Sequence, residues 1–179
     1  MRAALWDVPA MARILWQFER EADWLPRVRS PLTELRVLAW AVLRGTVRAV
    51  RVPDARGKLR AQAFIIRRGE RILALYTSGA ARRAGYGRML VQEAQRQSAR
   101  LQLFAAQDNA GARRFYAAMG FAEAARSDGR YNDEGLPDIH FVWTRAPSGI
   151  ARAQIGQAAS AGQGAEAPPQ AGMGHRSGS

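Results

Sequence analysis

The stretch of sequence that decides the fold reads Arg82-Arg83-Ala84-Gly85-Tyr86-Gly87-Arg88-Met89-Leu90. The apolar run at residues 72–76 just before it is typical of a strand, and residues 86–98 are typical of a helix. The sequence therefore predicts a strand, a turn that contains glycine, and the start of a helix. The first N–H groups of a helix have no partner within it and lie at the positive end of its dipole, so they can bind a phosphate.

Two residue types strengthen the prediction of a phosphate site at this turn. Glycines at positions 85 and 87 let the backbone approach a bulky anion. Arg82, Arg83 and Arg88 add positive charge at the same place. Taken alone, the spacing of the two glycines fits an ordinary turn before a basic helix equally well. It lacks the third glycine of the dinucleotide fingerprint and the Gly-Lys-Ser/Thr ending of a nucleotide-triphosphate loop.

A second stretch favours the phosphate site over the ordinary turn. It reads Asp108-Asn109-Ala110-Gly111-Ala112-Arg113-Arg114-Phe115-Tyr116-Ala117-Ala118-Met119-Gly120-Phe121. With both stretches in place, the sequence resembles the GNAT family, the acyl-CoA-dependent N-acyltransferases. The family's phosphate-binding motif, Gln/Arg-x-x-Gly-x-Gly/Ala, is matched by Arg82, Gly85 and Gly87. Its second motif, Asn-x-x-Ala-x-x-Phe/Leu-Tyr-x-x-x-Gly-Phe, is matched by Asn109, Ala112, Phe115, Tyr116, Gly120 and Phe121.

The resemblance implies a fold and a domain organisation. The expected architecture is α+β (mixed α/β), the GNAT-like acyl-CoA N-acyltransferase fold, in which about four helices flank a central, mostly antiparallel twisted sheet. We expect residues 1–145 to form one GNAT N-acetyltransferase domain. Residues 146–179 are rich in Ala, Gly, Gln, Ser and Pro, a composition that predicts a disordered tail.

Local signals predict the individual elements. Before the turn we expect a strand at residues 1–6, a helix capped by Asp7, and a helix from Ser30-Pro31 to Gly45. Strands at 47–52, 59–66 and 71–77 are separated by short turns and should pair antiparallel in sequence order. After the turn we expect a strand at 100–106, a helix capped by Asp108 or Asn109, and closing strands at 121–125 and 139–144.

Composition excludes several kinds of site. The chain has no cysteine and two histidines, so we expect neither disulfides, nor thiolate chemistry, nor a metal. The net charge is +12, and Lys58 is the sole lysine. Such a charge favours anionic partners, but no nucleic-acid-binding motif accompanies it, so we favour a basic protein that does not bind nucleic acid.

Hydropathy predicts the cellular location of the protein. No run approaches the roughly 20 apolar residues that span a bilayer. Asp7, Pro9 and Arg13 interrupt any signal-peptide core at the N-terminus. We therefore expect a cytoplasmic protein without a membrane partner.

The resemblance also implies how acetyl-CoA binds. Its pyrophosphate would lie on the backbone N–H groups of residues 82–88, and its pantetheine arm beside the third strand. That arm would lie between two splayed strands, which end at Thr77 and Ala106. The implied cofactor-binding residues are Leu75, Tyr76, Thr77, Arg82, Arg83, Ala84, Gly85, Tyr86, Gly87, Arg88, Asn109 and Tyr116.

By the same resemblance, Tyr116 occupies the general-acid position. A phenol has an ordinary pKa of about 10, so it is protonated at neutral pH and can donate to a leaving thiolate. The alternative is that Tyr116 is a core aromatic with a satisfied hydroxyl. Asn109 would cap its helix and contact the cofactor arm.

The general base is not assigned. The strand at residues 71–77 carries no acid. The segment 128–138 holds four acids and could attract an ammonium group, although a solvated turn has the same composition. Candidate acceptor contacts are Glu21, Trp24, Asp133 and Glu134.

The implied function is that of an N-acetyltransferase. An acetyl group would pass from acetyl-CoA to the primary amine of a small molecule or peptide by direct attack in a ternary complex, with the enzyme a monomer or a homodimer. The alternative is a catalytically weak, acyl-CoA-binding sensor or interaction module, which the missing strand acid favours.

Overall fold

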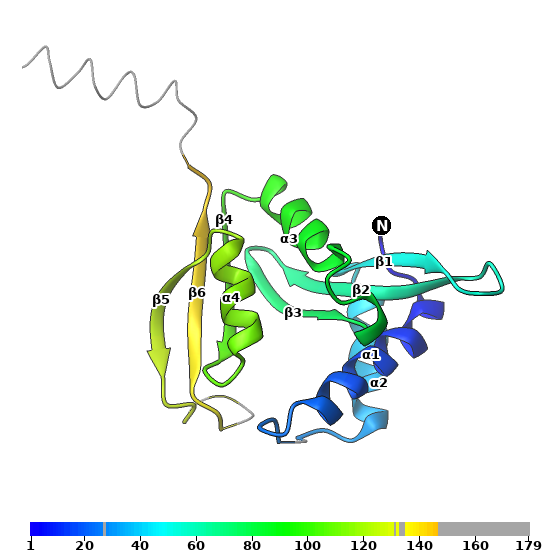
Figure 1. The fold of residues 1–179 in the computed structure, drawn as a ribbon, viewed down its shortest axis with the longest axis horizontal. Helices are drawn as coiled ribbons and strands as arrows, with labels where there is room; N and C mark the ends of the chain where they lie inside the picture. The colour runs from blue at the N-terminus through cyan, green and yellow to red at the C-terminus, as the bar shows by residue number, and fades with distance from the viewer. Residues whose placement is uncertain (27, 131, 133–134, 147–179) are drawn as a thin grey trace, which may run out of the picture. The chain divides into compact units, whose positions relative to one another are not determined.

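The computed structural model describes residues 1–26, 28–130, 132 and 135–146 (Figure 1). The chain divides into two units, a compact one at residues 1–145 and a second at residues 146–179 of which only Ala146 is described. The disordered tail therefore stays a prediction.

The first unit contains four α-helices and one six-stranded sheet among its described residues. In chain order the elements are η1 Leu5–Asp7, α1 Val8–Glu21, α2 Pro31–Leu43, β1 Val47–Pro53, β2 Leu59–Arg68, β3 Arg71–Thr77, η2 Gly79–Ala81, α3 Tyr86–Arg96, β4 Arg100–Ala106, α4 Ala110–Ala118, β5 Ala122–Ser127 and β6 Asp138–Thr144. The sheet order is β1-β2-β3-β4-β6-β5, and every neighbouring pair is antiparallel except β3 with β4. The predicted α+β architecture is thus confirmed.

Side chains that alternate along β2 fill two cores on opposite faces of the sheet. Ile65 belongs to the α3–α4 cluster, which also contains Leu90, Val91, Ala94, Leu101, Leu103, Tyr116, Met119, Phe121, Ile139 and Phe141. Its neighbour Phe64 belongs to the α1–α2 cluster, which also contains Val8, Met11, Ile14, Leu38, Ala41, Val42 and Val47. The strands are therefore covered by a helix pair on each side.

Two helix starts follow from their predicted caps. The Ser30 hydroxyl accepts the N–H of Thr33 at 3.3 Å, and Pro31 occupies the first turn of α2. The side-chain oxygen Oδ1 of Asn109 accepts the N–H of Ala112 at 2.9 Å at the start of α4. Each bond satisfies an N–H group that has no partner within its helix.

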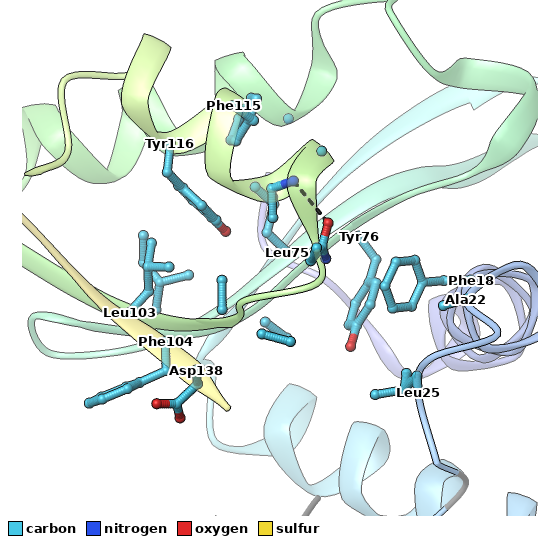
Figure 2. A pocket seen from close by; sticks show the side chains of 18 of the residues that line it. Phe18, Ala22, Leu25, Leu75, Tyr76, Leu103, Phe104, Phe115, Tyr116 and Asp138 are labelled. Carbon is cyan, nitrogen blue, oxygen red and sulfur yellow. Dashed lines mark hydrogen bonds between the residues drawn. The ribbon is translucent and has the colours of Figure 1, made fainter. Parts of the chain in front are cut away.

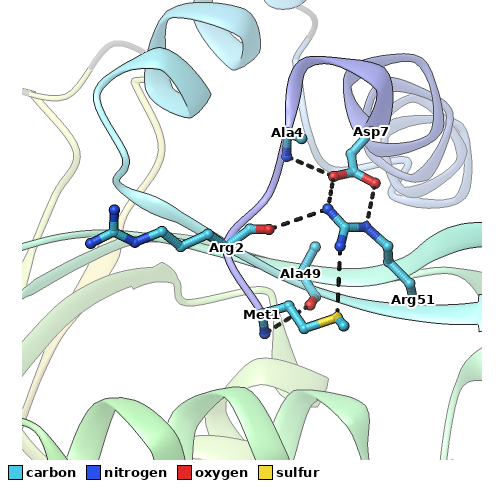
Figure 3. A network of polar contacts seen from close by, with 6 residues as sticks. All are labelled: Met1, Arg2, Ala4, Asp7, Ala49 and Arg51. Carbon is cyan, nitrogen blue, oxygen red and sulfur yellow. Dashed lines mark hydrogen bonds and ion pairs between the residues drawn. The ribbon is translucent and has the colours of Figure 1, made fainter.

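The predicted strand at residues 1–6 is wrong. A single bridge, Arg2 with Arg48, joins this segment to β1, and residues 5–7 then turn into a short 3₁₀ helix. Asp7 is the N-cap residue of α1, as predicted, but its side chain makes no capping hydrogen bond to that helix. Its carboxylate instead accepts the N–H of Ala4 at 2.8 Å and pairs with Arg51 (Figure 3).

The Asp7–Arg51 pair is almost fully buried and doubly bonded. Arg51 donates from Nε at 2.9 Å and from Nη2 at 2.6 Å, and the Asp7 side chain is only 2% exposed. Burial raises the pKa of Asp7, but the hydrogen bonds from Arg51 and Ala4 outweigh it and leave the pKa below its ordinary value. The pair therefore fixes the start of α1 on β1.

We expect Asp7→Asn to lower the free energy of unfolding by about 2–3 kcal/mol at pH 7, because it leaves a buried guanidinium without its anion. The pKa of Asp7 is lowered by folding, so its contribution is present above the ordinary pKa of 3.8 and is lost as pH falls below it. The difference between wild type and variant should therefore shrink as the pH falls below about 4 in urea unfolding.

Glu70→Gln is the matched control for this prediction. Glu70 pairs with Arg100 at 3.1 Å, but both side chains are well exposed, so the cost should stay under about 1 kcal/mol. Equal costs for the two variants at pH 7 would contradict the structural role of Asp7.

Candidate functional site

The sheet opens between its two central strands. Strands β3 and β4 pair at one position only, Arg71 with Gln102, where the N–H of Gln102 donates to the carbonyl of Glu70 at 2.9 Å. Beyond this pair the strands diverge toward Thr77 and Ala106 (Figure 1). A cavity of about 660 Å³ lies between them. The predicted splay of these two strands is confirmed.

A bulge in β3 directs its side chains toward the cavity. Ile66 of β2 pairs with Ala74, but the next residue, Arg67, pairs with Ile72, which leaves Leu73 unpaired and 49% exposed. Such an extra residue bends a strand and changes which face its side chains occupy. Leu73 becomes part of the cavity lining.

The cavity is lined from both faces of the sheet. Residues on the α3–α4 side include Thr77, Gly87, Asn109, Ala112, Phe115 and Tyr116. Residues on the α1 side include Phe18, Glu21, Ala22, Trp24 and Leu25. Phe104 of β4 and Asp138 of β6 close it from the other half of the sheet (Figure 2). Side chains from both faces of the sheet therefore line the same cavity.

The structure brings most of the sequence-predicted site residues to this cavity. Those in its lining are Leu75, Tyr76, Thr77, Arg82, Gly87, Asn109, Tyr116, Glu21 and Trp24. The remaining predicted cofactor contacts form the turn before α3 and its first residues, outside the lining: Arg83, Ala84, Gly85, Tyr86 and Arg88. Asp133 and Glu134 lie outside the described residues.

Sequence reasoning missed several lining residues. Within the acidic segment 128–138, the described acid that lines the cavity is Asp138, whereas Asp128 is exposed and pairs with Arg130. The alternation of β4 indicated that Phe104 points away from the core, and it is 48% exposed. Phe18 carried only the helical spacing of a core residue, so no signal marked it as a cavity wall.

Tyr116 directs its hydroxyl into the cavity (Figure 2). Its ring packs against Phe115, Phe121 and Phe141 at centroid distances of 5.2, 5.5 and 5.9 Å. Within the described part of the chain, its hydroxyl has no hydrogen-bond partner. Burial, and secondarily the nearby Tyr76, raise the pKa of the Tyr116 phenol well above its ordinary value. The phenol therefore keeps its proton at neutral pH and can act as a donor.

The turn before α3 presents backbone N–H groups. The N–H of Met89 donates to the Gly85 carbonyl at 3.0 Å, which is the first helical bond of α3. The N–H groups of residues 86–88 precede that ladder and can bind an anion. Arg83, with φ of 66°, and Gly85, with φ of 82°, both adopt the left-handed conformation that curves this turn. The donor set thus fits a phosphate group.

An ion pair joins the turn to α1. Arg82 donates to the Glu21 carboxylate, which also accepts from Gln17 at 2.8 Å. The hydrogen bonds from Arg82 and Gln17 lower the pKa of Glu21 below its ordinary value. Gln17 in turn accepts the N–H of Gly79 at 3.2 Å. Arg82, a predicted cofactor contact, therefore pairs with Glu21, a predicted acceptor contact.

His140 lies outside the cavity lining. Its ring stacks on Phe104 at 4.6 Å, and Nε2 lies 3.0 Å from Oε1 of Gln102. Over the described ranges, no group of three or more His, Asp or Glu side chains could hold a metal ion. No helix within those ranges is long and apolar enough to cross a membrane.

Comparison with known proteins identifies a family and several solved structures of similar fold. Residues 39–123 match the family profile described as Acetyltransferase (GNAT) domain. An N-acetyltransferase from Staphylococcus aureus Mu50 has a TM-score of 0.61 at 12% identity, over 79% of this chain and 98% of that one. Ard1 from Thermoplasma volcanium has a TM-score of 0.59 at 19% identity, over 82% and 96%.

A third solved structure, the NatC complex bound to Gag peptide and CoA, has a TM-score of 0.56 at 16% identity. It covers 78% of this chain and 91% of that one. At these identities, the likeness to all three structures is one of fold. Among curated proteins, no relative matches the sequence.

We expect Arg83→Gly to raise the free energy of unfolding by about 0.5–1 kcal/mol, because the left-handed conformation costs a residue with a Cβ about 1–2 kcal/mol. Arg83 is the only non-glycine residue with positive φ among the described residues. Thermal unfolding of the protein without ligand measures the change.

Arg88→Gly is the control, since it removes the same charge from the regular first turns of α3. It should lower stability by about 0.5–1 kcal/mol. A loss of stability in both variants would contradict backbone strain at Arg83.

Proposed function

This chain belongs to the GNAT acetyltransferase family, and we propose on that basis that it transfers an acetyl group from acetyl-CoA to the primary amine of an acceptor. One observation carries the proposal. The turn before α3 and the Tyr116 hydroxyl both reach the same cavity between β3 and β4. The NatC complex, which has the same fold, binds CoA. The proposed setting is the cytoplasm, with the enzyme a monomer or a homodimer.

The proposed phosphate site is the turn before α3. The N–H groups of residues 86–88 are not used by the helix, and they lie at the positive end of its dipole. Arg83 and Arg88 add positive charge, whereas the charge of Arg82 is paired with Glu21. A pyrophosphate on these groups would place the rest of acetyl-CoA at the cavity, because Gly87 lies in its lining.

The proposed position of the pantetheine arm is the open edge of β3. Past Arg71, the edge of β3 that faces β4 has no ladder partner among the described residues. Backbone groups of Leu75 and Thr77 on that edge are therefore available to the amides of the arm. Asn109 uses its carbonyl oxygen as the α4 cap, so its amide nitrogen is the part that can contact the arm.

Tyr116 is the proposed general acid. Acetyl-CoA, when bound, supplies the acetyl group as a thioester, which is already reactive. Tyr116 donates its proton to the sulfur as the carbon–sulfur bond breaks and the nitrogen–carbon bond forms. The nitrogen loses one proton to solvent and Tyr116 regains one, so the net change converts an amine and a thioester into an amide and a thiol.

A second candidate function is that of an acyl-CoA-binding module with weak turnover. The observation that favours it is the absence of any acid in β3, residues 71–77. Both functions require acetyl-CoA to bind, and they differ in whether a thiol is released once an acceptor is present.

The first test is binding of acetyl-CoA in a calorimetric titration. We expect saturable binding by wild type, and a loss of about 100-fold or more in affinity for Gly85→Glu, because a carboxylate at the turn repels the pyrophosphate. The control is Gly69→Glu, since Gly69 also has positive φ and open space around it but lies in the β2–β3 turn. Absence of binding at millimolar concentration would refute the proposed function.

The second test concerns Tyr116→Phe. We expect kcat to fall about 100-fold while the affinity for acetyl-CoA stays unchanged, because only the proton donor is lost. Tyr76→Phe, which removes the other phenol of the cavity lining, should reduce kcat much less. Equal turnover of Tyr116→Phe and wild type would refute the acid role.

The pH dependence of wild type adds a further check on Tyr116. Because burial raises its pKa, the phenol stays protonated as the pH rises. Deprotonation of Tyr116 should therefore cause no fall in kcat at any pH up to about 10. A fall in kcat near neutral pH that disappears in Tyr116→Phe would contradict this assignment.

A further inference from the structure

One wall of the cavity consists of apolar and aromatic side chains from α1, the segment after it, the strands and the residues just before β6. Its members are Phe18, Ala22, Trp24, Leu25, Leu73, Tyr76, Phe104 and Leu136. Phe18 holds the wall together, with its ring edge-on to Trp24 at 6.2 Å and against Tyr76 at 5.3 Å. Figure 2 shows Phe18, Tyr76 and Leu25 facing the same space as Tyr116. Such a wall favours an apolar group of the ligand.

Two described carboxylates lie in the cavity lining, and they differ in their partners. Glu21 is paired with Arg82, so its charge is already compensated. Asp138 accepts from the Ser127 hydroxyl at 2.6 Å and from the Asn132 amide at 3.1 Å. Both of these donors are neutral, and no cation pairs with Asp138 over the described ranges. A fixed negative charge therefore remains at the cavity, beside the apolar wall.

We propose that the acceptor is a primary amine carried by a bulky apolar group. Asp138 holds its single ammonium, which loses one proton to solvent before the neutral nitrogen attacks the thioester. This inference rests on the proposed acetyltransferase function. The apolar wall takes the carbon part of the acceptor, and the Asp138 carboxylate orients its charged end toward the opening between β3 and β4.

The same features select against acceptors with several charges. A second ammonium, as in a polyamine or an aminoglycoside, would have to leave water and lie against Phe18, Leu25 or Phe104 without a counter-charge. The net charge of +12 adds a long-range repulsion that grows with the charge of the acceptor. An acceptor with one positive charge avoids both costs.

An apolar primary amine has two sources, a free arylalkyl or alkyl amine and a peptide that begins with a bulky apolar residue. Both present the same chemistry to Asp138 and to the wall. The probes are therefore phenethylamine and a tetrapeptide that begins with Met, compared with spermidine and kanamycin. Preference between the first two probes identifies the source.

The first experiment measures binding without chemistry. Each amine is titrated by calorimetry into the full-length protein saturated with desulfo-CoA, a CoA analogue that has no thiol. We expect phenethylamine or the Met peptide to bind at least about tenfold more tightly than spermidine or kanamycin, because a pocket that rejects a buried charge discriminates at least this strongly. Tighter binding of spermidine or kanamycin, or no binding of any probe, would overturn the inference.

The second experiment measures thiol release from acetyl-CoA with the same four amines. Release with spermidine or kanamycin above that with the apolar amines would overturn the inference and leave the acetyltransferase function standing. Tight binding of an apolar amine without thiol release would support the inference on the acceptor and count against the proposed turnover. The two failures are therefore distinguishable.

A pair of variants tests whether the Asp138 carboxylate binds the ammonium group of the acceptor. Asp138→Asn should raise the Kd of the preferred apolar amine, and its KM, about tenfold or more, with the Kd of acetyl-CoA unchanged. Asp128→Asn removes the same charge from the same connection but outside the cavity lining, and both values should stay at wild-type level. Equal effects of the two variants on the amine would overturn the role of Asp138.

Discussion

The structure depends on one pair of residues in the sheet. Arg71 and Gln102 form the whole ladder between β3 and β4, so the antiparallel strands β1 to β3 join the strands β4, β6 and β5 at a single point. Past that point, two strand edges face each other with backbone groups that have no ladder partner in the described part of the chain. Such edges require another partner, and the cavity between them is where a ligand can supply it. The same constraint therefore joins the sheet and creates the site.

Packing on both faces keeps the opening in place. The α3–α4 cluster spans it, because Ile65 of β2 and Leu103 of β4 belong to the same cluster. On the other face, the buried Asp7–Arg51 pair anchors the start of α1, and the exposed Glu21–Arg82 pair links its end to the turn before α3. The walls of the cavity thus rest on two rigid cores, which is the arrangement that orients groups for reaction.

The parts of the fold that local chemistry determines could be predicted from the sequence. The caps Ser30 and Asn109 act through residues three positions away, so their motifs are sufficient evidence. Asp7 occupies a third N-cap position, but its side chain bonds Arg51, which is 44 residues away, and no local pattern indicates such a pair.

The same distinction between local and long-range determinants applies to the residues that line the cavity. Tyr116 was visible in a motif, whereas the place of Phe18 and Asp138 in the lining depends on how α1 and β6 approach the opening. A single ladder pair has one further consequence, since it fixes the distance between two strands at one end only. The width of the cavity beyond the Arg71–Gln102 pair is therefore set by the side chains of the α3–α4 cluster that span the opening, not by hydrogen bonds between the strands.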